Sequence, residues 1–556
     1  MLTPTHPKGR EARVLLTSVF GPYAQDDQFG SRSINPMELF HNQVTREQGP
    51  FSLRMFHRSW GLMFLQANIS APSVLLDFPT LNRFLEEITN ESYDVIGITS
   101  IVMNVGKVRE MCRLIRECSP HSKILIGGHV AAIPELPAMV DADHIVRGEG
   151  VRWLRTYLGD DPDQPVNHPA IVSGFGKRAF GLSADTGPDT RAATIIPSVG
   201  CPLGCNFCAT SEFFGGKGNF SNFYDTGEEL FNVMSRLEAE EGVRSFFVMD
   251  ENFLLHRRRA LELLELMKQH GKAWSFYMFA SANALAKYKM EELVALGVSW
   301  VWMGLESPNS SYAKLKRVDT RKLVAELQEN GVKVLGSTII GLEHHTPENL
   351  PAEVDYAVSH GTDFHQFMLY TPLPGTPLHR EMKKRGRMLD DVDPADIHGQ
   401  YKFNFRHDTI SRDQSQSLLK WAFRRDYEIN GPSLFRVCRT DFLGWRRYRK
   451  HSDERISERF RREAHELHRN YAAMLWAMEH YLRGINPRIV ERIRGLRSEM
   501  QREFGVITRL FATLGGPFVL WNSRREARRL AAGQTYEPPT FIERRNWAGE
   551  GHGLSG

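Results

Sequence analysis

The stretch "SVGCPLGCNFCATSEFFG", residues 198–215, concentrates three of the chain's six cysteines in one short loop. Cys201, Cys205 and Cys208 have the spacing C-x3-C-x2-C. Three thiolates at this spacing can converge on one metal centre, whereas a tetrahedral zinc site or a fully ligated four-iron cluster usually takes four protein ligands. A cluster with one iron left open can bind a substrate or cofactor at that iron. The missing fourth cysteine therefore favours a reactive centre over an electron carrier.

The position of this loop in the chain gives it further meaning. Six apolar runs of strand type alternate with helical patterns, and a glycine near the end of each helical pattern is a typical helix stop signal. Six βα units in a row predict a barrel or partial barrel, where chemistry gathers at the C-terminal ends of the strands. The cysteines directly follow the first strand, so we expect them at the catalytic mouth. The six runs are "ATIIPSV", "SFFVMDENF", "WSFYMFASA", "WVWMGLES", "KVLGSTIIGL" and "FHQFMLYTPL".

The N-terminal part of the chain shows a similar alternation. Short apolar runs, several of them ended by glycine, flank a helical pattern at 106–118. Such a pattern predicts a doubly wound, Rossmann-like parallel sheet, which binds ligands beyond the carboxyl ends of its strands. We interpret residues 22–72, which are longer and more polar than a simple crossover needs, as a ligand-facing insertion. The runs are "RVLLTSVFG", "SVLLDFP", "YDVIGITSIV", "KILIGGHVAA" and "ADHIVRGEG".

These patterns predict an α/β chain with three domains. The expected divisions are an N-terminal domain at 1–160, a linker at 161–190, a barrel at 191–377 and a mainly helical region at 378–556. Between residues 412 and 532, Lys and Arg are about twice as frequent as Asp and Glu. We interpret this excess as a solvated helical face, with an acidic partner as the alternative.

One apolar segment stands out in the helical region. The stretch "FGVITRLFATLGGPFVLW", residues 504–521, is interrupted by an arginine and by Gly-Gly-Pro. We interpret it as a buried docking segment, with contact at a membrane surface or cover for a hydrophobic substrate as the alternatives.

The overall composition excludes several classes of protein. The 556 residues are too many for one core, and 41% of them are hydrophobic, enough to bury several. The N-terminus lacks a secretion-signal pattern, no apolar run reaches the roughly eighteen residues that span a bilayer, and mean hydropathy is −0.37. A net charge of +4 gives no support for a nucleic-acid partner. We expect a cytoplasmic protein whose clustered thiols serve a metal or redox role instead of disulfides.

The cysteine loop resembles that of the radical S-adenosylmethionine (SAM) enzymes. The shared features are C-x3-C-x2-C after the first strand of a βα barrel and an aromatic residue, Phe207, before the third cysteine. The resemblance implies a [4Fe-4S] cluster held by Cys201, Cys205 and Cys208, whose open iron chelates the amino and carboxylate groups of SAM. Reduction by an external donor such as flavodoxin or ferredoxin then yields a 5′-deoxyadenosyl radical.

The same resemblance implies roles for residues at other strand ends. Asp250 and Glu251 in "VMDENF" match an acidic motif that holds the methionine amino group, although the common Gly-Gly-Glu form is absent. Glu306 in "GLES" is a candidate for the ribose hydroxyls. Gly336 and Gly341 in "GSTIIGL" would let the cofactor approach the backbone. For each taken singly, a helix cap or a simple turn is the alternative.

A doubly wound domain before this barrel resembles the cobalamin-binding subfamily, which includes C-methyltransferases and the anaerobic cyclase of porphyrin biosynthesis. Ser100, Gly127 and Gly128 match positions that line the nucleotide tail of cobalamin. The Asp-x-His-x-x-Gly signature that supplies a histidine to cobalt is absent, since "DDQFG" at residues 26–30 has no histidine. The resemblance implies a cobalamin-dependent enzyme that methylates an unactivated carbon of a small molecule or lipid-like metabolite. Oxidation, cyclisation or rearrangement is one alternative, and a noncatalytic iron–sulfur or zinc module is another.

Overall fold

The computed structural model describes most of the chain, in segments. Most of the insertion expected at 22–72 and half of the expected linker lie outside the described residues, as does "DDQFG" apart from Phe29. The described residues are 4–21, 29, 47–52, 58–173, 178–179, 182–183, 191–306, 318–532 and 539–547.

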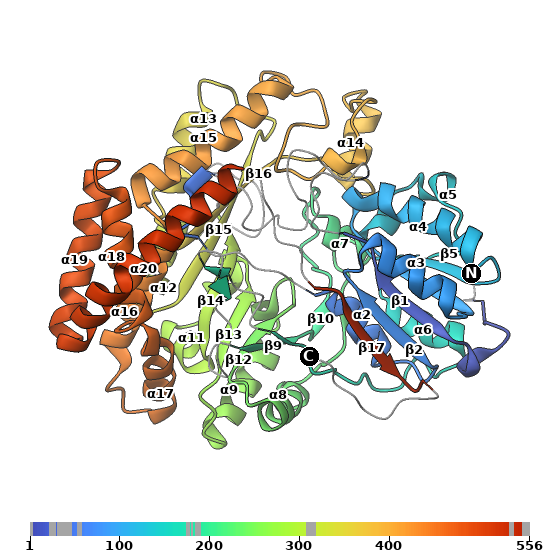
Figure 1. Cartoon of the computed structure of the whole chain (residues 1–556), viewed down its shortest axis with the longest axis horizontal. Helices are drawn as coiled ribbons and strands as arrows, with labels where there is room; N and C mark the ends of the chain where they lie inside the picture. The colour runs from blue at the N-terminus through green and yellow to red at the C-terminus, as the bar shows by residue number, and fades with distance from the viewer. Residues whose placement is uncertain are drawn as a thin grey trace.

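The N-terminal domain is built on a mostly parallel sheet (Figure 1). Its strands lie in the order β17-β2-β1-β3-β4-β5, so the parallel part has the 2-1-3-4-5 order of a doubly wound fold, with a switch point between β1 and β3. The helices α3 (Leu81–Asn90) and α4 (Val105–Cys118) cover one face, while α2 (Trp60–Gln66) and α6 (Gly150–Leu158) cover the other. The parallel strands are β1 (Val14–Ser18), β2 (Ser73–Asp77), β3 (Val95–Thr99), β4 (Lys123–Gly127) and β5 (His144–Ile145).

Alternation along the strands explains why both faces are covered. Leu15 and Ile96 point into the core under α3 and α4, whereas their neighbours Leu16 and Val95 point into the core under α2 and α6. Successive residues of a strand face opposite sides, so a strand that is apolar throughout needs a layer on each side. The predicted doubly wound domain is confirmed.

The second sheet follows the chain in simple order. Six parallel strands run β9-β12-β13-β14-β15-β16, and the short β6 (Val172–Ser173) pairs antiparallel with β9 at the edge. Helix α8 (Gly227–Glu241) begins with a capping box between Thr226 and Glu229 and ends at Gly242, whose φ is 67°. The strands are β9 (Ala192–Ile195), β12 (Ser245–Val248), β13 (Ser275–Phe279), β14 (Val298–Gly304), β15 (Lys333–Ile340) and β16 (Phe364–Leu369). The helices between them are α9 (Arg257–Gln269), α11 (Met290–Leu296), α12 (Thr320–Glu329) and α13 (Leu350–Val358).

The rest of the chain is mainly helical and packs against the second sheet (Figure 1). Buried ion pairs join the two parts: Lys333 of β15 contacts Asp441 at 2.6 Å, and Arg436 donates to the Thr362 carbonyl and pairs with Asp426. Several arginines that the composition assigned to a solvated face therefore point inward. The helices are α14 (Pro377–Lys384), α15 (Arg412–Asn430), α16 (Ser433–Tyr448), α17 (Glu454–Glu463), α18 (Asn470–Leu482), α19 (Pro487–Phe504) and α20 (Val506–Ala531).

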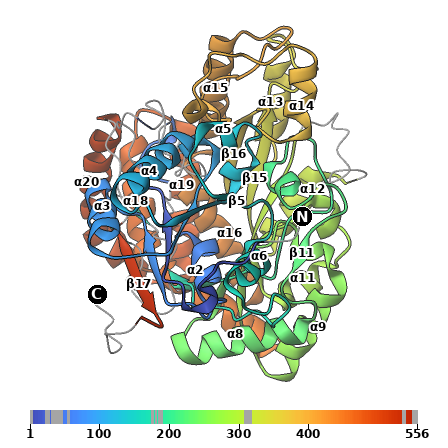
Figure 2. The ribbon, with the colours of Figure 1, turned by 90° about the vertical axis from the view of Figure 1, so that its right-hand side faces the viewer.

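The C-terminal segment returns to the N-terminal domain. Strand β17 (Phe541–Arg545) pairs antiparallel with β2, and Figure 2 shows it at one side of that domain. After it, the Trp547 ring lies 4.1 Å from the Arg13 guanidinium carbon and 5.6 Å from the Tyr93 ring. Because β17 covers the edge of β2, the first and last described parts of the chain form one sheet.

We predict that a chain ending at residue 532 has a thermal midpoint roughly 5–10 °C lower for the N-terminal domain, since the β2 edge and the Trp547 contacts are lost. A chain ending at residue 547 keeps β17 and is the matched control. Differential scanning calorimetry of both chains measures the effect, and equal midpoints would show that β17 adds no stability.

Candidate active site

The carboxyl ends of the two sheets face one cavity of about 890 Å³. From the N-terminal sheet it is lined by the ends of β3 and β4, and from the second sheet by the ends of β13, β14, β15 and β16. The cysteine loop and α7 (Ala209–Phe213) line it between them (Figure 1). Parallel strands gather their carboxyl ends at one edge, so two sheets whose edges face each other enclose a single site.

Close backbone packing shapes the cysteine loop. Gly204 has a φ of 61°, and a Cβ there would lie 2.4 Å from the Lys217 Cβ. The Ser211 hydroxyl donates to the Cys201 carbonyl at 2.7 Å, and the Ser211 N–H donates to Cys208 Sγ at 3.4 Å. All three cysteines line the cavity, as the sequence predicted.

The charge balance of the loop indicates what it binds. Burial, with smaller contributions from Cys208, Cys205 and Glu251, raises the pKa of the Cys201 thiol to about 11. The protein alone therefore disfavours a thiolate here, whereas a coordinated metal deprotonates a thiol outright. This donor set fits a metal centre that brings its own positive charge.

The spacing of the sulfurs argues against a single zinc ion. Among the described residues, only His344, His345 and Glu353 form a His/Cys/Asp/Glu group whose ligand atoms all lie within 4.8 Å of one another. The three loop sulfurs are thus spread more widely than in a tetrahedral site, where Zn–S bonds of about 2.3 Å place sulfurs roughly 3.8 Å apart. A wider spread fits the separate irons of a cluster.

The two adjacent acidic residues after β12 have different roles. Asp250 accepts hydrogen bonds from Ser198 Oγ and from the Asn252 N–H, and pairs with the buried Arg259 at 2.7 Å. Asp250 is not among the residues that line the cavity, and its carboxylate holds the loop, so its contact with the cofactor stays a prediction. Glu251 lines the cavity, and within the described residues its Oε2 is buried without a hydrogen-bond partner.

Burial raises the pKa of Glu251 to about 7, with a further contribution from Asp250. A cationic group placed beside it would restore the charged form. The methionine ammonium of SAM is such a group, so Glu251 fits this cofactor.

Glu306 and Phe207 also line the cavity. Glu306 follows β14 with a φ of 47°, an uncommon conformation for a residue with a side chain, and it is 2% exposed. Such strain tends to be kept where a side chain must point in one direction. The Phe207 ring packs edge-on to Tyr370 with centroids 6.4 Å apart, which joins the cysteine loop to the end of β16.

The predicted glycine contacts on the fifth strand are not brought into the cavity. A Cβ at Gly336 would lie 2.5 Å from Leu305 Cδ1, and one at Gly341, whose φ is 80°, would lie 2.2 Å from the Phe403 ring. Both glycines therefore make room for protein side chains, and their approach to the cofactor stays a prediction. Ser337 and Ile339, on the same strand, line the cavity instead.

The glycine pair after β4 behaves differently. Gly127 lines the cavity, and a Cβ built on it meets nothing within 4 Å, so the space beside it is open. Gly128 also lines the cavity, but its φ of 76° and a 2.6 Å approach to the Ser100 carbonyl oxygen make it necessary for the turn itself. Thr99, the last residue of β3, lines the cavity, whereas the next residue, Ser100, does not.

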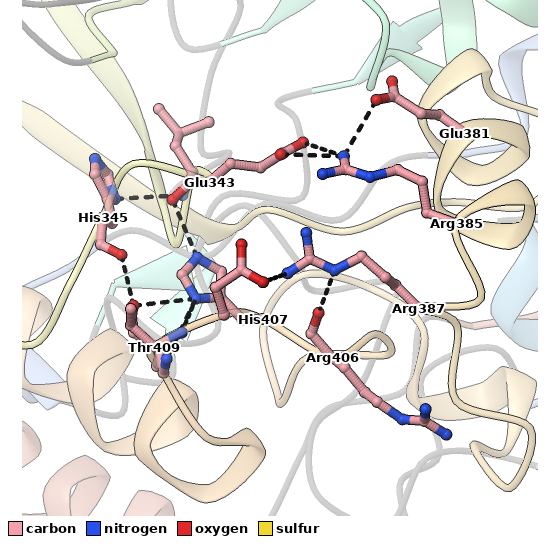
Figure 3. A network of polar contacts seen from close by, with 11 residues as sticks. Glu343, His345, Glu381, Arg385, Arg387, Arg406, His407 and Thr409 are labelled. Atoms are coloured by element: carbon pink, nitrogen blue, oxygen red, sulfur yellow. Dashed lines mark hydrogen bonds and ion pairs between the residues drawn. The ribbon is translucent and has the colours of Figure 1, made fainter.

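The segment after α14 is joined to the loop after β15 by a network of polar contacts (Figure 3). His407 Nε2 donates to the Leu342 carbonyl at 3.1 Å, and the Thr409 hydroxyl donates to the His345 carbonyl at 2.9 Å. His345 Nδ1 accepts backbone N–H groups from Gly341 and Leu342, so its Nε2 carries the proton of a neutral ring. Burial lowers the pKa of His345 to about 4, so the ring is neutral, and with Nδ1 bonded to the backbone and Nε2 protonated it has no free lone pair for a metal.

Sequence reasoning missed several residues of the cavity wall. Trp60 lies in the long gap between the first two strand patterns, and Trp302 alternates with buried residues in β14, so only the sheet geometry places them here. His398 lies in an irregular segment, is 2% exposed, and burial lowers its pKa to about 4. No local signal in the sequence marks this histidine.

Comparison with known proteins agrees with this geometry. Residues 62–157 match the B12 binding domain model, and residues 195–357 match the radical SAM superfamily model. Bacteriochlorophyllide d C-12(1)-methyltransferase of Chlorobaculum tepidum is 30% identical over 387 residues, which cover 65% of this chain and 82% of that protein.

This chain belongs to the cobalamin-dependent radical SAM methyltransferase family. Hopanoid C-2 methylase of Rhodopseudomonas palustris is 26% identical over 363 residues, covering 60% of this chain and 67% of the relative. The solved structure of the radical SAM methyltransferase TsrM from Kitasatospora setae, with cobalamin and a [4Fe-4S] cluster bound, has the same fold. It is 16% identical, has a TM-score of 0.50, and covers 82% of this chain and 99% of the other.

The cofactors of this family member are a [4Fe-4S] cluster, SAM and cobalamin. The cavity offers each a suitable wall: three thiols for the cluster, the buried carboxylate of Glu251 for the SAM ammonium, and the open space at Gly127 for cobalamin.

We predict that Cys208→Ala abolishes cluster binding and SAM cleavage, because the remaining loop has two thiols. Cys118→Ala, on the exposed end of α4, is the matched control and should retain both. Iron and sulfide content, the paramagnetic resonance of the reduced cluster and 5′-deoxyadenosine release measure the outcome. A Cys208→Ala protein that still cleaves SAM would contradict the cluster assignment.

We predict that Gly127→Val reduces cobalamin binding by about tenfold or more, since the added side chain enters open space that the cofactor needs. Lys123→Val, at the exposed start of the same strand, controls for the strand itself and should bind normally. Visible absorbance after reconstitution and gel filtration reports cobalamin per chain. Equal occupancy in both variants would place the cofactor elsewhere.

Proposed function

We propose that this protein transfers a methyl group from SAM to an unactivated carbon of a small, largely apolar metabolite. The single observation that carries the proposal is the shared cavity, because the cysteine loop and the open wall at Gly127 face the same space. When bound, the cluster and cobalamin supply the electron-transfer and methyl-carrier chemistry that side chains lack. A common cavity lets both act on one substrate.

The protein's contribution is binding, orientation and exclusion of water. Glu251 holds the SAM ammonium, and Glu306 is aimed at the cofactor by its backbone conformation. A primary carbon radical takes hydrogen atoms from accessible S–H and aliphatic C–H bonds, whereas aromatic C–H bonds are too strong to react, so an aromatic wall protects the reaction. Phe279 and Trp302 supply such a wall in this cavity.

The apolar substrate class rests on the wall provided by the second sheet. Phe279 and Trp302 pack with ring centroids 5.0 Å apart, and Ile339 and Met368 lie on neighbouring strands of the same wall. Pockets lined in this way take apolar ligands and orient them with a few polar groups. Two relatives are named for bacteriochlorophyllide and hopanoid substrates, which supports an apolar substrate here.

The proposal is tested with SAM that carries a CD3 group. The reconstituted chain, a chemical reductant and labelled SAM are incubated without oxygen with lipid and aqueous extracts of the source cells, and products are read by high-resolution mass spectrometry. We expect an extract component, from the lipid fraction, in which CD3 replaces one hydrogen.

The Cys208→Ala protein is the control and should give no labelled product. An unlabelled product that has lost hydrogen or gained a ring, formed with 5′-deoxyadenosine, would overturn methyl transfer in favour of oxidation or cyclisation. A labelled product confined to the aqueous fraction would overturn the apolar substrate class.

A further inference from the structure

Helix α20 (Val506–Ala531) reverses the usual arrangement of an amphipathic surface helix (Figure 1). Its large apolar side chains point to solvent, with Val506 81% exposed, Leu514 69%, and Phe518 and Trp521 each 58%. Ile507, Leu510 and Phe511 are exposed beside them. The expectation that residues 504–521 form a buried docking segment is therefore corrected.

The inward face of α20 explains how the helix is held. Its buried residues are small or polar, among them Thr508, Ala512 and Ser523, while Val519 and Leu520 are partly buried against the helical core. A Cβ at Gly516 would lie 2.4 Å from the Trp476 ring of α18, so glycine lets the two helices approach closely. Gly515 and Gly516 serve this packing, and the helix continues through them and Pro517 without ending.

The exposed apolar residues form one stripe. Ile507, Leu510, Leu514, Phe518 and Trp521 follow one another at intervals of three or four, which places them on one side of a helix. An exposed apolar surface of this extent on a monomer indicates a contact site for another protein or for a membrane. We call these five residues the apolar stripe of α20.

The charged residues around the stripe indicate which kind of partner binds it. Arg509, Arg524, Arg525 and Arg528 are exposed on α20, while its one acidic residue, Glu526, is buried and paired with Arg529 at 2.6 Å. The exposed surface of this helix thus combines apolar side chains with positive charge alone. Arginine next to tryptophan and phenylalanine is typical of helices that lie in the interface of an anionic bilayer.

We propose that α20 docks this protein on the surface of an anionic lipid membrane, with the stripe inserted among the acyl chains and the arginines at the lipid headgroups. Among the described residues, no helix is long and apolar enough to cross a bilayer. The helix therefore lies in the plane of the membrane. This inference does not depend on the proposed methyl transfer, because docking requires no turnover.

A second copy of the chain matches the charge around the stripe less well than an anionic membrane does. A two-fold contact pairs a surface with itself, so it would bring the exposed arginines of one copy close to those of the other without an exposed acid on either helix. Like charges facing each other across an interface oppose association. An anionic lipid surface has the complementary charge.

The test is flotation of the full reconstituted chain with vesicles of equal parts phosphatidylglycerol and phosphatidylcholine, or of phosphatidylcholine alone. We expect binding to the anionic vesicles that weakens with added salt, and little binding to the neutral ones. The triple variant Leu510→Ser/Leu514→Ser/Phe518→Ser should lose roughly a hundredfold or more in vesicle affinity. Its thermal midpoint and SAM cleavage should be unchanged, since the three side chains are exposed.

Two further variants sharpen the result. Arg524→Gln/Arg525→Gln/Arg528→Gln should weaken anionic binding by roughly tenfold or more and reduce its salt dependence. Ile542→Ser, at a 38% exposed position on β17, is the matched control and should bind as the parent chain does.

Three outcomes overturn the proposal. The first is absence of the chain from anionic vesicles, and the second is equal vesicle binding by the parent and the triple variant. The third is a dimer in analytical ultracentrifugation that the triple variant abolishes, because the stripe would then join two copies. None of these outcomes bears on the proposed methyl transfer, because vesicle binding requires no turnover.

Discussion

The structure depends on the contact that holds the carboxyl edges of the two sheets face to face. At its centre, the His129 ring, just after β4, stacks on Phe213 of α7 with centroids 5.1 Å apart. The turn after β16 approaches the same place, since a Cβ at Gly375 would lie 2.5 Å from the Ala132 carbonyl oxygen. Ion pairs Arg380–Glu212 and Lys383–Glu135 surround this contact. Each sheet has an exposed ligand edge on its own, but only this packing turns two edges into one enclosed cavity.

The cavity contains ionisable side chains whose burial costs free energy until a ligand binds. The pKa of the Cys201 thiol and of the Glu251 carboxyl are both raised, chiefly by burial. Burying ionisable groups without partners costs free energy, and that cost is offset when a metal or a cation binds. The burial that costs free energy in the empty cavity therefore favours the binding of these ligands.

Much of the fold was predictable because local patterns determine it. Apolar runs such as "KILIGGHVAA" have no alternative to a buried parallel strand, and the cysteine spacing directly identifies the cluster loop. Side-chain direction was not predictable at the same level. Asp250 and Glu251 are neighbours with the same chemistry, yet Asp250 turns away from the cavity to Ser198, 52 positions earlier, and to Arg259, nine residues later in α9.

The features that the sequence did not reveal have a common physical cause, namely contacts between segments far apart in the sequence. The Phe403 ring fills the space in front of Gly341, and Phe403 lies in an irregular region that no local pattern places there. Strand β17 is a short run with charged residues that pairs with β2 across more than 460 positions. In α20 apolar residues occur on all sides of the helix, so the sequence does not show which side is buried. Packing against α18 buries the side that carries the small residues.

The central claim is that cluster and cobalamin share one cavity, and the magnetic coupling between them tests it most directly. The chain would be loaded with both cofactors, reduced so that the cluster and cob(II)alamin are each paramagnetic, and measured by pulsed electron paramagnetic resonance. The account predicts a strong dipolar interaction between the two centres in the parent protein. Two spectra that add as independent signals, in protein with one cluster and one cobalamin per chain, would contradict it.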